Sequence, residues 1–282
     1  MQPSIDFNHC IIKINLEGGP LFQELTDNKL PFGTIPNTIQ NAQALVIPTS
    51  KKEVEPIKLI NIPYKPIVQN NYKRQVEVNI VDKNLAVSSR LKVEGQAASS
   101  YRSYFQTLTK EESKEKVAQV LDDYFEGDLV LNNYNFINLE KLNSDLVFDI
   151  DVTVEKEVLA IGGINAIKPP FMEQLFSLDA FSKDDRIHPL QYWQYEDSDG
   201  YEVEIIFNLP EGSTIVEMPK NLTIKEDILD YQLTIEQLAN NQLKIIRKAT
   251  IKRPNISSTD YANFRKIVEQ IIEAENAYIA FK

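Results

Sequence analysis

Residues 7–14, FNHCIIKI, place His9, one of the two histidines of this chain, directly beside Cys10, its only cysteine. A cysteine thiolate is a strong nucleophile, and an imidazole within hydrogen-bond reach can take up the thiol proton. These are the residue types of a cysteine acyl-transfer centre. Their geometry decides whether they can act together.

The β-branched residues around the pair predict an extended segment, in which successive side chains point to opposite faces. This alternation sends His9 and Ile11 to one face and Cys10 and Ile12 to the other. A thiol that faces away from the imidazole cannot give it a proton. We therefore expect Cys10 to be a small apolar core residue rather than a nucleophile.

A second candidate site is aromatic. Exposed aromatic side chains that carry a polar group can line a groove for a carbohydrate or a peptide. The same residue types also pack within sheets, and packing is their more frequent role. Both interpretations stay open for the set Tyr192, Trp193, Tyr195 and Tyr201.

Charge and composition exclude several classes of function. A formal net charge of −11 disfavours binding to nucleic acid or to an anionic membrane surface. One cysteine and two distant histidines give no internal disulfide and no metal site, so we expect no metal. The sequence contains no phosphate-binding loop and no apolar run near the ~20 residues that span a bilayer. We expect no cofactor and no membrane insertion.

The elements that position His9 begin with a predicted hairpin, in which residues 8–15 and 21–26 are strands joined through Gly18 and Gly19. Prolines punctuate the extended stretch that follows, up to Pro66. We place the first boundary near residue 70, so residues 1–70 form an N-terminal unit.

Two further units are predicted. Residues 71–185 form a β domain that begins with a hairpin and contains two helical segments, the second of which stops at Gly127. Residues 186–282 form an antiparallel β domain closed by a helix and the strand AYIAF. An apolar stripe and a Ser257–Asp260 capping spacing predict that helix. The fold class is α+β, with mostly antiparallel, sandwich-like sheets and a few helices.

Several stretches together resemble a known family. They are FNHCIIKINLEGGPLFQELTDNKLPFGTIPNTIQNAQALVI, GQAASSYR at 95–102, RIHPLQYW at 186–193, LPEG at 209–212 and the terminal DYANFRKIVEQI. They resemble the closing part of the transglutaminase-like, papain-related catalytic core of large bacterial proteins. In these proteins a C-terminal β-rich region of unknown function follows the core. The resemblance covers nearly the whole chain.

The resemblance implies that His9 is equivalent to the catalytic histidine of the family and Glu24 to the carboxylate that orients it. Aspartate is usual at the second position, and the extra methylene of Glu24 changes how the carboxylate meets the imidazole. The catalytic cysteine of the family lies upstream, at the start of a helix that this chain does not contain. Members are usually exported to the periplasm, whereas the first residues here carry no export signal.

We therefore expect a non-catalytic interaction or scaffold protein. Residues 1–50 are expected to bind a protein partner or to self-associate, because a catalytic sheet without its helices exposes apolar surface and strand edges. One alternative is a cysteine acyl-transfer enzyme, completed by an upstream segment or a partner chain. The other is a surface module that binds glycan or peptide through the aromatic set.

Overall fold

The protein is known from a computed structural model, which describes residues 9–36, 39–40, 42–48, 57–63, 71–191, 199–238, 241–252 and 255–282. Everything stated below about its structure refers to these residues.

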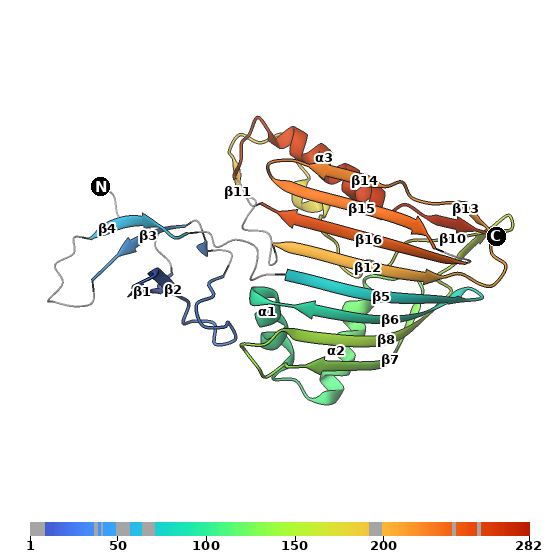
Figure 1. Cartoon of the computed structure of the whole chain (residues 1–282), viewed down its shortest axis with the longest axis horizontal. Coiled ribbons are helices and arrows are strands. Elements are labelled where there is room, and N and C mark those ends of the chain that lie inside the picture. Colours follow the sequence, from blue (N-terminus) through green and yellow to red (C-terminus); the bar gives the residue numbers. More distant parts are fainter. Residues whose placement is uncertain are drawn as a thin grey trace.

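An eight-stranded sheet forms the centre of the molecule (Figure 1). Its strand order is β14-β15-β16-β12-β5-β6-β8-β7, and every neighbouring pair is antiparallel except β12 and β5, which are parallel. The strands are β5 (Asn71–Val81), β6 (Asn84–Val93), β7 (Asp128–Ile137), β8 (Leu146–Glu155), β12 (Gly200–Asn208), β14 (Leu222–Lys225), β15 (Leu229–Gln237) and β16 (Gln242–Ile251).

Period-two alternation builds this sheet. In β5, for example, Val76, Val78 and Ile80 are buried, whereas the residues between them are exposed. The exposed face carries polar side chains that pair across strands, such as Arg90 Nε with Asp149 Oδ1 at 2.7 Å. The sheet therefore has one solvent-exposed face and one face that packs in the core.

Helices cover only the core face. Figure 1 shows α1 (Gly95–Phe105) and α2 (Lys110–Asp122) behind the half made by β5 to β8, and α3 (Tyr261–Glu275) behind the half made by β14 to β16. A reciprocal capping box between Thr109 and Glu112 begins α2. Ser257 and Asp260 form hydrogen bonds in the turn just before α3, but they do not cap the helix as the spacing predicts, because its N-cap residue is Asp260, which makes no side-chain cap hydrogen bond.

The second predicted helix ends earlier than expected, at Asp122 rather than at Gly127. Gly127 instead lies against β8, where an added Cβ would come within 2.1 Å of the Glu155 carbonyl oxygen. Its amide also donates to Glu157 Oε2 at 2.7 Å. A close backbone approach therefore accounts for the glycine better than a helix stop does.

Small sheets complete the part that follows residue 155. A four-stranded sheet has the order β13-β18-β10-β9, and β11 pairs with β17. Their bounds are β9 (Leu159–Ile161), β10 (Ile164–Ile167), β11 (Leu190–Gln191), β13 (Ile215–Glu217), β17 (Asn255–Ile256) and β18 (Ile279–Phe281), and a short 3₁₀ helix, η2, spans Leu178–Phe181.

The N-terminal segment, defined as the described residues from 9 to 62, lies beyond one end of the large sheet (Figure 1). It contains two separate hairpins, whose strands are β1 (Ile12–Leu16), β2 (Gly19–Gln23), β3 (Gln43–Val46) and β4 (Lys58–Asn61). Phe22, Ile35 and Ile62 form its own small core. It contacts α1 where Ser99 Oγ donates to Asp27 Oδ2 at 2.7 Å, and Lys29 Nζ donates to Gln106, the residue after α1.

The predicted fold class, α+β with mostly antiparallel strands and a helix near the C-terminus, is confirmed. The predicted units 1–70, 71–185 and 186–282 stay predictions. Strands from both sides of residue 186 share the large sheet, because β5 to β8 and β12 to β16 are joined through the β5–β12 pair. None of the described helices is long and apolar enough to cross a membrane.

Candidate functional site

His9 and Glu24 lie together at the open end of the first hairpin. Glu24 follows β2 directly, and His9 precedes β1 by three residues. Since Ile12 pairs with Gln23, extending the register by one residue sets Ile11 opposite Glu24. His9 and Glu24 therefore share a face as diagonal neighbours, and His9 Nε2 contacts Glu24 Oε2.

The Glu24 carboxylate is firmly held. The residue is 2% exposed, and Oε1 accepts from the amides of Leu25 at 2.8 Å and Thr26 at 2.5 Å. Burial alone would raise the pKa of Glu24, but the hydrogen bonds from the Thr26 amide and from His9 bring it below its ordinary value. An ionised carboxylate at this place fixes the imidazole so that Nε2 carries the proton.

That tautomer leaves Nδ1 of His9 with a lone pair. The side chain is 35% exposed, so a group arriving from outside can reach the ring. Within the part of the chain that the structure describes, no hydrogen bond engages Nδ1. The arrangement can therefore take up a proton from an incoming thiol or hydroxyl, provided that another polypeptide supplies one.

Cys10 does not take part. Ile11 packs against the small core of the N-terminal segment, whereas Ile12 and Ile14 line a hollow on the opposite face of the hairpin. The alternation of faces expected from the sequence therefore holds from Ile11 onward. The expectation that Cys10 is a buried core residue is wrong, because Cys10 is exposed and its thiol is free.

The aromatic set is described in part. Tyr192, Trp193 and Tyr195 lie outside the described residues, and their binding role stays a prediction. Tyr201 begins the inner row of β12, where its ring lies 5.7 Å from the ring of Tyr72 and packs against the main core. For Tyr201 this packing favours the structural interpretation.

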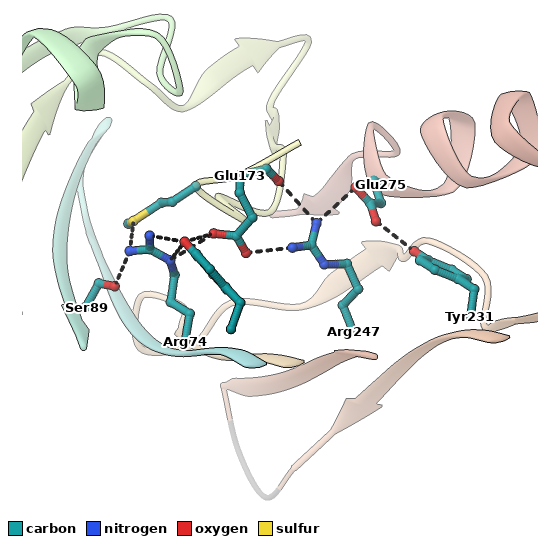
Figure 2. A network of polar contacts seen from close by, with 8 residues as sticks. Arg74, Ser89, Glu173, Tyr231, Arg247 and Glu275 are labelled. Carbon is teal, nitrogen blue, oxygen red and sulfur yellow. Dashed lines mark hydrogen bonds and ion pairs between the residues drawn. The ribbon is translucent and has the colours of Figure 1, made fainter. Parts of the chain in front are cut away.

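A polar cluster that the sequence did not predict lies between strands of the large sheet and α3 (Figure 2). Glu173 lies at its centre and joins two arginines: Oε2 accepts from Arg74 Nε at 3.0 Å and Oε1 accepts from Arg247 Nη2 at 2.6 Å. Arg247 Nη1 also donates to Glu275 of α3 at 3.1 Å. Glu275 in turn accepts from the Tyr231 hydroxyl, at 3.1 Å.

The cluster balances its own charge, with two guanidinium groups against two carboxylates. Burial alone would lower the pKa of Arg247, but the charges of Glu275 and Glu173 raise it above the ordinary value. Burial raises the pKa of Glu275 even though Arg247 opposes that shift. Arg247 therefore stays charged and forms ion pairs with Glu173 and Glu275.

The described contacts assign this cluster a structural role. The guanidinium of Arg74 donates hydrogen bonds to Glu173, to Tyr72, to Ser89 Oγ at 2.9 Å and to the sulfur of Met172 at 3.5 Å. No carboxylate of the cluster is left to act as a base, because each one accepts from an arginine. The cluster links the segment around Glu173, and also α3, to the large sheet.

A sequence signal for the cluster exists. Arg74 and Arg247 occupy inward positions of strands whose other inward residues are apolar, such as Val76 and Ile245. A charged residue at such a position must find a buried partner, because a lone buried charge is too costly. The signal does not identify the partner, since Glu173 lies in a segment without regular structure.

The lowered pKa of Glu24 predicts how the hairpin end responds to acid. Its stabilisation is complete above the ordinary value of 4.5 and is lost as pH falls through the lower folded-state pKa. In NMR spectra the amide shifts of Leu25 and Thr26 should titrate with a midpoint below 4.5, and Glu24→Gln should abolish that titration. His9→Gln should move the midpoint upward without removing it. A wild-type midpoint at or above 4.5 would contradict the described hydrogen bonds.

Comparisons with known proteins match part of the chain to a family and give a distant structural similarity. Residues 162–281 match the model of a family described as a domain of unknown function with solved structures, DUF3858. Among solved structures, the chain is similar to a "putative protease" from Parabacteroides distasonis ATCC 8503. The identity is 15%, the match covers 43% of this chain and 24% of that chain, and the TM-score is 0.35. No curated protein matches the sequence. The chain thus contains a domain of unknown function and has a distant similarity to that protein.

Proposed function

We propose that this chain is a non-catalytic interaction or scaffold protein whose N-terminal segment binds another polypeptide. The observation that carries the proposal is the exposure of apolar side chains in this segment. Phe32 is 72% exposed, Ile47 67% and Leu25 61%. The other large apolar residues exposed in the segment are Ile12, Leu16, Leu45, Ile57 and Leu59.

Three of these side chains, Ile12, Leu25 and Phe32, lie together. A hollow of about 440 Å³ collects several of them on the hairpin face opposite His9, and it is lined by Ile12, Ile14, Gln23, Leu25, Leu30, Phe32, Leu142 and Asn143. The first hairpin, which carries part of this hollow, and the second hairpin are each two-stranded sheets, and their outer strand edges pair with no other strand among the described residues. Apolar surface next to open edges is typical of a surface that another chain covers.

Self-association tests this proposal first. We expect sedimentation equilibrium to show concentration-dependent association of the wild-type chain, and Leu25→Ser with Phe32→Ser to abolish it. The matched control is Val81→Ser with Ile187→Ser, which removes apolar residues that are 60% and 90% exposed outside the segment. This control should associate as the wild type does. A wild-type monomer at all concentrations, with rapid hydrogen exchange throughout the segment, would contradict binding through this surface.

A second candidate function follows from the His9–Glu24 pair. The pair is preassembled, with an oriented imidazole whose Nδ1 faces no described partner. Together with the transglutaminase-like resemblance around FNHC, this supports a cysteine acyl-transfer centre that an upstream segment or a partner chain completes with its thiol. In that case the binding surface and the catalytic surface belong to the same segment.

Thiol reactivity separates the role of this chain alone from that of a completed enzyme. We expect a thiol-directed acylating probe at neutral pH to label Cys10 at the rate of an ordinary exposed thiol. His9→Gln should leave that rate unchanged, because the imidazole and the thiol do not form a pair. A rate well above that of a free thiol that falls on His9→Gln would show an activated thiolate within this chain and would overturn the non-catalytic proposal.

A further inference from the structure

An apolar pocket lies between the α1–α2 pair and the large sheet, away from the His9–Glu24 pair. Its volume is about 250 Å³. Residues from α1, α2, the turn after α2, β5, β8 and the segment before Glu173 line it, and its aromatic members are Tyr101, Tyr104, Phe105, Tyr124 and Phe148. Nothing in the proposed interaction function uses this pocket.

The pocket has a buried floor and an open mouth. Floor residues such as Val117, Phe148 and Met172 are at most 5% exposed. At the mouth, Tyr104 is 43% exposed and Val120 40%. A deep apolar site with large, partly exposed apolar side chains at its entrance is typical of a ligand pocket.

The inner end of the pocket does not favour a charged occupant, and at the mouth Lys116, which lies over the Tyr104 ring, already donates to Gln119 Oε1 at 2.7 Å. Arg74 is the ionised residue of the lining, and its guanidinium already contacts Glu173, Tyr72, Ser89 and Met172. An incoming carboxylate would therefore lose its hydration without gaining a free cation. An uncharged ligand meets no such cost.

Backbone strain at the wall is an independent observation. Met172 has a φ of 58°, a left-handed conformation that residues with a side chain rarely adopt. It is 2% exposed and sets its sulfur 3.5 Å from Arg74 Nη1. Such strained residues cluster at ligand-binding sites, and a thioether contacts aromatic rings favourably.

Size and lining define the ligand. An engineered apolar cavity of ~150 Å³ binds benzene, and pockets for drug-sized molecules begin near ~300 Å³. The volume here falls between them, and three tyrosines and two phenylalanines dominate the lining. We propose that this pocket binds a small uncharged aromatic molecule of one or two fused rings, stacked among the tyrosine and phenylalanine rings.

Indole is a suitable probe, measured by ligand-observed NMR and isothermal titration calorimetry. We expect saturable binding to the wild type, and binding weakened about tenfold or more by Val120→Trp, which fills the mouth from an exposed position. Val130→Trp is the matched control, because Val130 is 48% exposed on β7 and does not line the pocket. It should bind indole as the wild type does.

A charged analogue tests the ligand class. Indole-3-acetate should bind more weakly than indole, because its carboxylate finds no free cation next to Arg74. Far-UV circular dichroism and the melting temperature must show both tryptophan variants folded. The proposal fails if indole does not saturate the wild type, if folded Val120→Trp binds as well as wild type, or if indole-3-acetate binds more tightly than indole.

Discussion

The charges of Arg74, Glu173, Arg247 and Glu275 are the constraint on which the main body depends, with both arginines buried and both carboxylates largely shielded from solvent. They join strands from both halves of the large sheet to α3 and to the irregular segment around Glu173. Among the described residues, Arg74 is paired only with Glu173 and Glu275 only with Arg247, so removal of Glu173 or of Arg247 leaves one charged partner without its counterion. Such a loss lowers the free energy of unfolding by about 3–5 kcal/mol, whereas each ion pair on the solvent-exposed face of the sheet contributes below ~1 kcal/mol. The segment that carries Glu173 also forms the strained wall of the aromatic pocket through Met172.

A different constraint governs the N-terminal segment, whose described residues form a small core of their own and donate to or accept from Ser99 of α1 and Gln106 just after it. Strand alternation gives its first hairpin one face that holds the Glu24 carboxylate against His9 and a second face that exposes apolar residues. The two candidate functions use these two faces. An incoming polypeptide can cover the apolar hollow whether or not it also brings a thiol to the imidazole.

Several features that depend on local periodicity were predicted from the sequence. Apolar patterning predicted a hairpin at the start of the second unit, where β5 and β6 form one, an apolar stripe located α3, and a glycine turn located the first hairpin. The sequence also predicted the opposite faces of Ile11 and Ile12. The resemblance supplied Glu24 as the partner of His9, and the structure places the two in contact.

Long-range pairing was not predicted. Nothing local shows that β12 pairs with β5 in parallel, or that Glu173 meets two arginines from distant strands. Cys10 was misassigned because a short edge segment leaves one face uncovered, so an apolar residue type is exposed there.

A double-mutant cycle on Glu173 and Arg247, measured as free energies of unfolding in denaturant, tests the central claim most directly. We predict that Glu173→Gln and Arg247→Met each cost about 3–5 kcal/mol and that the double variant costs less than their sum by roughly 1–3 kcal/mol. Additive single effects below ~1 kcal/mol, as expected for the exposed Arg90–Asp149 pair, would contradict it.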